Sequence, residues 1–286
     1  MSYVLLFLVT ILSGTMTVLR KSLQKGLQLD FSNFTFYNFV NAAVGSVFLL
    51  IACKFQPQFN ITTILYALIY TVVVFVSLVA TMLFLSKNPV SLLNLSTTAG
   101  SLIPSALVGA LVFKEPCTLN LVISVLLMLA ALVLPYFKTT NKQLSLKTML
   151  FCFLIFAAGG ANVILIKFFS ATDAHAESMF FLTNLFLFVI CGAILFISRI
   201  ATKQNCKGFT FKQYANIGAT TCLSNIVSVL TAYILIDMAV STFTVLNSSL
   251  TLLLGAWISI VIFKEKSTLE NNIALALAII AVAFSI

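Results

Sequence analysis

Long apolar runs alternate with short polar clusters along the whole chain, and ten such runs can be distinguished. Each run contains about 20 residues, the length that a helix needs to cross a hydrocarbon layer of about 30 Å at 1.5 Å per residue. The runs are continuously apolar rather than alternating, so they predict helices and not the strands of a membrane barrel. The ten predicted membrane helices cover residues 4–21, 34–53, 62–86, 90–113, 119–137, 149–169, 179–200, 214–236, 240–263 and 269–286.

Short polar clusters connect the predicted helices and leave no room for a soluble domain between them. The connections at 87–90 and 237–240 contain so few residues that we expect an antiparallel hairpin at each. The first stretch, MSYVLLFLVTILSG, has no basic segment and no cleavage site of small residues. We therefore expect it to be the first membrane helix rather than a cleaved signal peptide.

Composition strengthens the prediction of a membrane protein. Hydrophobic residues make up 61% of the 286 residues, charged residues make up 8%, and the mean hydropathy is +1.13. Soluble domains contain roughly 25% charged residues, so a soluble fold would leave much of this apolar surface in contact with water. We expect an all-α, multi-pass integral membrane protein of the cell (plasma) membrane, surrounded by the lipid bilayer.

The net charge of +9 does not indicate a nucleic-acid-binding protein, because the basic residues form no stripe and no dense cluster. They lie near the ends of the apolar runs, as membrane-flanking residues do. The six cysteines have neither the paired spacing of a zinc site nor the pattern of a disulfide framework. We expect no nucleic acid, metal or cofactor, and the sequence leaves open whether the chain is a monomer or a homodimer.

A ten-residue string occurs twice in the chain. LVFKEPCTLN at 111–120 returns as VIFKEKSTLE at 261–270, an offset of 150 residues. The correspondence extends in both directions and predicts that a five-helix unit has been duplicated, with one copy at 1–140 and the other at 145–286. Further corresponding positions are Val90-Ser91 with Val240-Ser241 and Leu102 with Leu252 at an offset of 150, and Gly14 with Gly160 and Lys21 with Lys167 at an offset of 146.

The odd number of helices in the unit has a mechanical consequence. A unit of five membrane helices begins on one side of the membrane and ends on the other, so its second copy is inserted upside down. Inverted repeats of this kind place a substrate site near the middle of the membrane, and exchange of the two conformations opens the site to alternate sides. The sequence therefore predicts transport by alternating access.

The whole chain resembles the drug/metabolite transporter superfamily in its EamA-like branch. The resemblance rests on the ten apolar runs and on each half ending with an apolar helix, the string Phe-Lys-Glu, a Thr-Leu and a last apolar helix. Glu115 and Glu265 stand where that family has a glutamate at the end of the fourth helix of each half. The resemblance implies a ten-helix transporter, and for this branch it implies that both termini lie inside the cell.

Polar residues in the middle of several predicted helices are the candidate substrate-binding residues. Asn, Ser and Thr are costly in contact with lipid, so we expect them to face a cavity or a neighbouring helix. The alternative is that they form hydrogen bonds between helices or within their own helix and bind no substrate. The candidates are Asn94, Thr97, Thr98, Ser101, Asn162, Asn225, Asn247, Ser248 and Thr251.

The positions of the acidic residues limit the substrate. All seven Asp and Glu residues lie at the ends of apolar runs or in turns. A proton-coupled exporter of organic cations needs a carboxylate within the membrane, so that function is disfavoured. We expect a small neutral or zwitterionic metabolite, such as an amino acid, and keep a multidrug or organic-cation exporter and a non-transporting membrane scaffold as alternatives.

Enzyme chemistry is not expected. The single histidine, His175, lies in a polar turn, and no predicted helix contains a pair of carboxylates or a cluster of metal-ligating residues. A membrane-embedded enzyme would need such a nucleophile, acid-base pair or metal site. We therefore predict no catalytic residues.

Two indications of membrane orientation conflict. Thirteen of the 16 Lys and Arg residues lie by the connections that follow odd-numbered helices, and Lys54, Lys114 and Lys167 lie by the others. The positive-inside rule then places both termini outside the cell. The family resemblance implies termini inside, so the orientation remains open at this point.

The residues Phe-Lys-Glu are expected to have a local role, because the two copies lie at opposite faces of the membrane. They would end one helix, and Thr118 or Thr268 would cap the next. Lys21 and Lys167 are expected to extend toward the membrane interface or to attract an anionic group at the mouth of a cavity.

Overall fold

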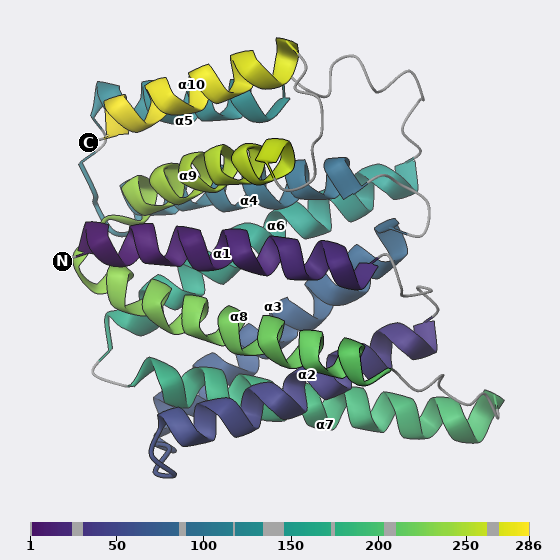
Figure 1. Cartoon of the computed structure of the whole chain (residues 1–286). Coiled ribbons are helices and arrows are strands. Elements are labelled where there is room, and N and C mark those ends of the chain that lie inside the picture. Colours follow the sequence, from purple (N-terminus) through teal and green to yellow (C-terminus); the bar gives the residue numbers. More distant parts are fainter. Residues whose placement is uncertain are drawn as a thin grey trace.

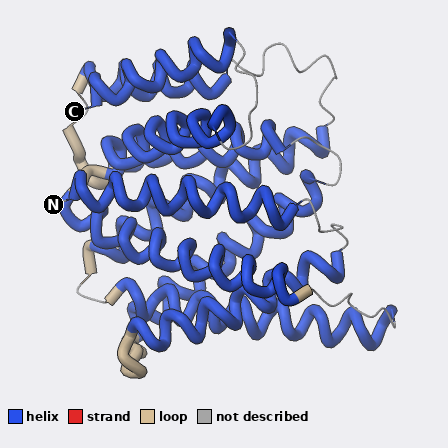
Figure 2. Tube along the Cα trace, in the orientation of Figure 1, coloured by secondary structure: helices blue, strands red, loops and turns tan. Residues whose placement is uncertain are grey.

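The computed structural model describes residues 2–24, 31–85, 90–116, 118–133, 146–172, 175–202, 210–261 and 269–285, and within them the chain forms ten α-helices and no strand (Figure 2). A helix is confirmed at each of the ten predicted places, and most helix ends differ from the predicted ones by three residues or fewer. The helices are α1 (Ser2–Gln24), α2 (Phe31–Ala52), α3 (Ile61–Leu85), α4 (Val90–Leu111), α5 (Leu119–Val133), α6 (Leu146–Ser170), α7 (Ala176–Thr202), α8 (Phe211–Asp237), α9 (Val240–Val261) and α10 (Leu269–Ser285).

The differences at the ends have a common cause. α2, α6, α7 and α8 each begin three residues before the predicted apolar run. Hydropathy marks where a helix becomes apolar, whereas backbone hydrogen bonding continues into the polar turn at the interface. For α8, Thr210 and Gln213 form a capping box that starts the helix before its apolar part.

The helices lie roughly parallel to one another in a bundle, and the two chain ends lie on the same side of it (Figure 1). The connections α2–α3, α4–α5, α6–α7 and α8–α9 lie on that side as well, which we call the termini side. Consecutive helices therefore run in opposite directions. Helices that are five apart in the sequence, such as α1 and α6, also run in opposite directions.

Helix pairing follows a regular pattern. α1 packs against α8 and α9, while α6 packs against α3 and α4. α2 packs against α8, and α7 packs against α3. Three further pairs, α2 with α7, α4 with α9 and α5 with α10, join helices that are five apart. In Figure 1 the pair α5 and α10 forms one edge of the bundle and the pair α2 and α7 forms the opposite edge.

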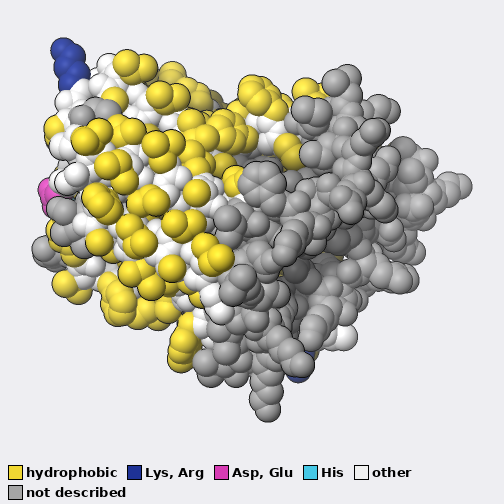
Figure 3. Space-filling view, turned by 90° about the horizontal axis from the view of Figure 1, so that it is seen from above, with side chains coloured by type: hydrophobic (Ala, Val, Ile, Leu, Met, Phe, Trp, Pro, Cys, Tyr) yellow, Lys and Arg dark blue, Asp and Glu magenta, His cyan; other side chains and the backbone are white. Residues whose placement is uncertain are grey.

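Five of the described helices, α2, α3, α6, α7 and α8, are long and apolar enough to cross a membrane. The described parts of the other five form shorter apolar helices of 10–17 residues. Large hydrophobic side chains are exposed on the outside, among them Ile61 and Leu111, which are 76% and 77% exposed. Hydrophobic side chains cover much of the described part of the face in Figure 3. Such a surface is typical of a helical membrane protein.

Within the described part of the chain, most of the buried hydrophobic residues belong to one large cluster or to two smaller ones. The large cluster joins α1, α2, α3, α6, α7, α8 and α9 and includes Leu49, Phe169 and Leu235. One small cluster, around Leu102 and Met128, holds α5 and α10 against α4 and α9. The centre of the bundle is thus built from helices of both halves of the sequence.

Candidate functional site

The contact between α4 and α6 is made by glycines. A Cβ atom on Gly100 would overlap the backbone oxygen of Phe156, and one on Gly159 would lie 2.8 Å from the backbone oxygen of Thr97. A Cβ on Gly160 would lie 2.6 Å from Cβ of Pro104. The two backbones can approach this closely only because the glycines have no side chain, as in other membrane helix pairs with small residues.

The candidate residues of α4 lie beside this contact. Thr97 is exposed, Thr98 and Ser101 are half-buried, and the Ser101 hydroxyl donates to the backbone oxygen of Thr98 at 2.8 Å. The described side chains do not include Asn94. The hydroxyl group of Ser105, one turn further along α4, is buried and has no hydrogen-bond partner within the described part of the chain.

Two candidate asparagines have an unsatisfied acceptor. The Oδ1 atoms of Asn162 on α6 and Asn247 on α9 are buried and have no hydrogen-bond partner among the described residues. An unsatisfied buried polar group costs about 1–3 kcal/mol. Such atoms in a native structure call for an explanation, and a ligand that supplies a donor is one. Both atoms remain candidates for substrate contact.

The other candidates on α9 differ in environment. Ser248 is 7% exposed, whereas Thr251 is exposed on the outside of its helix. The neighbouring Ser249 hydroxyl lies 3.2 Å from the sulfur of Met128 on α5. Ser248 is thus the candidate that lies inside the bundle beside Asn247.

Asn225 belongs to a separate polar network of α2, α7 and α8. Its Oδ1 atom accepts a hydrogen bond of 3.0 Å from Nδ2 of Asn184, and its own Nδ2 donates to the backbone oxygen of Thr221 at 3.0 Å. The Thr221 hydroxyl donates to Oδ1 of Asn41 on α2. A Cβ on Gly45 of α2 would lie 2.5 Å from Oδ1 of Asn184, so this glycine makes room for the amide. The network holds three helices together.

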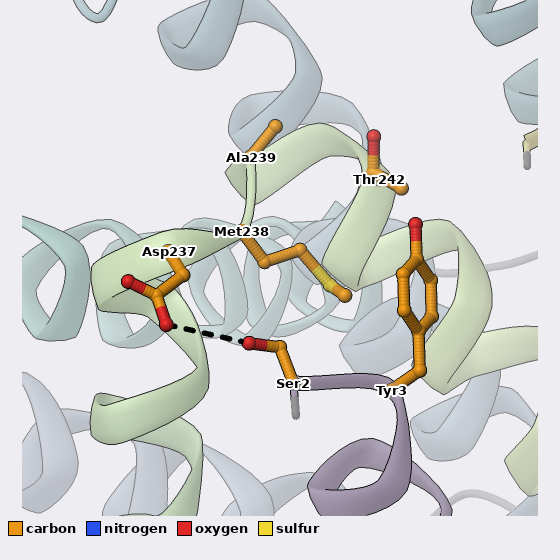
Figure 4. A pocket seen from close by; sticks show the side chains of 6 residues that line it. All are labelled: Ser2, Tyr3, Asp237, Met238, Ala239 and Thr242. Carbon is orange, nitrogen blue, oxygen red and sulfur yellow. Dashed lines mark hydrogen bonds between the residues drawn. The ribbon is translucent and has the colours of Figure 1, made fainter.

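Two cavities among the described residues lie away from the nine candidate residues, none of which lines either of them. The larger, of about 270 Å³, lies on the termini side between the start of α1 and the α8–α9 turn. There the Ser2 hydroxyl lies 3.5 Å from Oδ2 of Asp237, and the Tyr3 hydroxyl points toward Thr242 (Figure 4). The smaller, of about 30 Å³, lies between α2, α3 and α7 and has a mainly apolar lining that includes Asn38.

Glu115 has a role that the sequence analysis missed. Thr118 caps α5 as predicted, with its hydroxyl accepting from the Leu121 backbone N–H at 3.2 Å. From the sequence, Glu115 is expected only to help end α4, but its carboxylate also binds the start of α9. Its Oε1 accepts from Val240 N–H at 2.7 Å, and its Oε2 accepts from the N–H and the hydroxyl of Ser241 at 3.2 Å and 2.7 Å. Thr268 and Glu265, in the second copy of the string, lie outside the described residues.

Lys167 has partners that the sequence did not indicate. Its Nζ donates to the backbone oxygens of Leu235 and Met238 at 2.6 Å and 3.0 Å, so it caps the end of α8. The same ammonium lies 5.9 Å from the centre of the Phe113 ring. A cation at the end of one helix and the Glu115 carboxylate at the start of the next complement both helix dipoles of the α8–α9 turn. The described residues do not include the side chain of Lys21.

The described residues contain no group of three or more His, Cys, Asp or Glu side chains that could hold a metal ion. His175 is exposed at the start of α7. The candidate polar groups that the structure describes inside the bundle are amides and hydroxyls, which bind a ligand by hydrogen bonding.

Comparison with known proteins identifies the fold and no family. No family model matches the sequence, and no curated protein matches it. A solved structure described as "Crystal structure of protein" is similar over 99% of this chain and 97% of that chain, with a TM-score of 0.76 and 12% sequence identity. At this identity the likeness shows the fold alone, and it extends over essentially the full length of both chains.

Proposed function

We propose that this chain is a membrane transporter of the EamA-like branch of the drug/metabolite transporter superfamily. It moves a small neutral or zwitterionic, amino-acid-like metabolite by alternating access between two inverted five-helix repeats, residues 1–140 and 145–286. All ten helices span the membrane in this proposal. The observation that carries it is the pattern of helix pairing.

Most helix pairs have a counterpart when each helix is exchanged for the helix five places away, whereas α6–α8, α5–α9 and α7–α8 have no counterpart of similar extent. The pairs α1–α8 and α1–α9 become α6–α3 and α6–α4, and α2–α8 becomes α7–α3; all of these pairs occur. In the pairs α2–α7, α4–α9 and α5–α10 the exchange only swaps the two members, so each pair is unchanged. Because the exchanged helices run in opposite directions, the pattern supports a twofold axis in the plane of the membrane, as in carriers built from inverted repeats.

The unsatisfied amides of α6 and α9 support a substrate site in the centre of the bundle. Asn247 has Thr97 as its counterpart in the sequence repeat, so the two helices that pair across the proposed axis each bring one candidate side chain. The Oδ1 atoms of Asn162 and Asn247 accept no hydrogen bond from the described residues. A substrate with amine, amide or hydroxyl donors would satisfy them.

The charges favour a neutral or zwitterionic substrate over an organic cation. The described carboxylates Glu115, Glu177 and Asp237 lie at helix ends or turns on the termini side. A cation exporter would need a carboxylate within the membrane to exchange a proton for the drug. A non-transporting scaffold remains the alternative to a carrier, and transport measurements distinguish the two.

Ligand binding is the first test. Purified protein is screened by thermal shift against amino acids, amines, nucleosides and sugars, because a ligand stabilises the folded state by RT ln(1 + [L]/Kd). The best ligand is then followed for uptake into proteoliposomes. Asn247→Leu and Thr97→Leu should each lose the ligand-induced shift and the uptake while the unliganded protein stays folded.

The matched control is Asn272→Leu, which makes the same change on the exposed side of α10. This variant should bind and transport as the parent does. Normal binding by both Asn247→Leu and Thr97→Leu would exclude the proposed site. An organic cation as the best ligand, or binding without uptake, would favour one of the alternative functions.

A further inference from the structure

The contact made by Glu115 joins the two halves of the sequence. Glu115 belongs to the first repeat, 1–140. Its hydrogen-bond donors, Val240 and Ser241, belong to the second repeat, 145–286. The two backbone N–H groups lie in the first turn of α9, where no intrahelical acceptor is available. Hydrogen bonds to an ionised carboxylate are shorter and stronger than those between neutral groups. This is therefore a specific contact between halves, made at one end of the bundle.

The chain around Glu115 is shaped to allow this contact. A Cβ on Gly109 would lie 2.5 Å from Oε2 of Glu115, so a larger residue at 109 would occupy the place of the carboxylate. The Glu115 backbone N–H donates to the Gly109 oxygen at 3.0 Å, which folds the connection back under the end of α4. Lys114 has a φ of 51°, in the left-handed region that residues other than glycine seldom adopt. Such strain is retained where the surrounding structure requires it.

A second acidic residue on the termini side provides a contrast. Glu177, at the start of α7, accepts a hydrogen bond of 2.6 Å from the Tyr233 hydroxyl of α8. Both residues belong to 145–286. Loss of that bond weakens a contact within one half, whereas loss of the Glu115 contact weakens one between halves.

We propose that Glu115, with Val240 and Ser241, forms a latch that holds the two repeats together at the termini side in this conformation. The inference rests on the proposed function, because alternating access requires the contacts between repeats at one end to break when that end opens. Release of Glu115 from the start of α9 then accompanies opening of the termini side. A variant without the carboxylate shifts the population toward the form open on that side.

A buried position behind the latch can report the opening. Ser105 of α4 is 0% exposed and lies one turn from Gly109 toward the middle of the helix. Ser105→Cys, in a full-length chain whose six native cysteines are replaced by alanine, is treated with a charged methanethiosulfonate reagent. The measurement is the initial rate of labelling of purified protein, and it needs no substrate.

Glu115→Gln should raise the labelling rate of Ser105→Cys about tenfold. This is the size of population shift expected when charge-assisted hydrogen bonds that stabilise the latched conformation are weakened. Ser241→Ala removes one of the three donors and should give a smaller rise. Glu177→Gln is the matched control and should leave the rate unchanged. Opening toward the opposite end would not produce this rise, because Ser105 lies nearer the termini side.

Unchanged labelling in both Glu115→Gln and Ser241→Ala, with melting temperatures showing that the variants are folded, would overturn the latch. An equal rise in Glu177→Gln would also overturn it, because the effect would then be general loosening. Faster labelling in Glu115→Gln without any transported substrate would support the latch and contradict the transport proposal. If the protein takes up a substrate but Glu115→Gln leaves the labelling rate unchanged, the transport proposal is supported and the latch is contradicted.

Discussion

Nδ2 of Asn184 on α7 donates a hydrogen bond of 3.0 Å to Oδ1 of Asn225 on α8. The same Nδ2 donates to the Phe180 backbone oxygen of its own helix at 2.8 Å, and Oδ1 of Asn184 faces the bare Cα of Gly45 on α2. One amide side chain thus contacts three helices. Because lipid offers no competing donors or acceptors, this contact contributes to the specificity of packing among α2, α7 and α8.

The coupling between these amides should be measurable by a double-mutant cycle. Asn184→Ala and Asn225→Ala should each destabilise the protein, and their effects should be less than additive by about 0.6 to 1.7 kcal/mol, the range found for hydrogen bonds between membrane helices. The free energy of unfolding is measured by detergent titration of the two single variants and the double variant. Ser228→Ala is the control, because that hydroxyl donates to the Ser224 backbone oxygen of its own helix at 3.0 Å. Fully additive effects would contradict the coupling.

The glycine contact between α4 and α6 gives a second prediction. Gly100→Ala would place a methyl group against the backbone oxygen of Phe156, which cannot move aside as a side chain could. We expect a loss of stability of about 1–3 kcal/mol, the usual cost of overpacking. Thermal unfolding of the purified variant measures the loss.

Gly218→Ala on α8 is the matched control for that substitution. A Cβ there meets no heavy atom of the described residues within 4 Å, so the change adds helix propensity without a clash. It should be neutral or stabilising by up to about 1 kcal/mol. Similar losses in Gly100→Ala and Gly218→Ala would show that the close approach of α4 and α6 is not what makes Gly100 necessary.

The sequence was sufficient to predict the helices, because apolar runs of about 20 residues leave the backbone few alternatives in lipid. It also predicted the Thr118 cap, which depends on residues within one turn. It did not predict that Glu115 contacts Val240, because that contact depends on which helices pack together. The corresponding positions Val90-Ser91 and Val240-Ser241 were the available signal, since they mark the start of a helix in each half.

The polar residues within the helices show again that the sequence does not predict contacts between distant helices. Asn225 and Asn247 are both asparagines within an apolar helix, and nothing in the sequence distinguishes their environments. In the structure Asn225 is bound by Asn184, whereas Oδ1 of Asn247 has no partner among the described residues. The direction in which a helix turns its polar side chain depends on neighbours that are far away in the sequence.

Lys167 should stabilise the α8–α9 turn. Lys167→Met keeps the length of the side chain but removes the ammonium that donates to Leu235 and Met238. We expect a loss of about 1–3 kcal/mol, because hydrogen bonds to charged groups contribute about 1.5–3 kcal/mol when buried and less when partly exposed. Hydrogen exchange at the end of α8 should become faster. Lys212→Met, an exposed lysine at the start of the same helix, should change neither stability nor exchange.

Cys53, in the α2–α3 connection, gives a prediction about pH. Burial raises the pKa of its thiol above the ordinary value, the Ser178 hydroxyl lowers it by hydrogen bonding, and the negative charge of Glu177 raises it. The Cys53 sulfur lies 4.0 Å from the Ser178 hydroxyl. Since the thiolate is the reactive form, alkylation of Cys53 should increase with pH and reach its half-maximal rate above the pKa of an ordinary cysteine.

Two substitutions should shift this pH dependence in opposite directions. Glu177→Gln removes a negative charge that disfavours the thiolate, so the midpoint of the rate profile should fall. Ser178→Ala removes a hydrogen bond that favours the thiolate, so the midpoint should rise. The profile is measured with iodoacetamide on a chain that retains only Cys53, between about pH 7 and pH 11 to span the ordinary thiol pKa. Shifts in the same direction in both variants would indicate that a change in exposure, and not the local charges, controls the thiol.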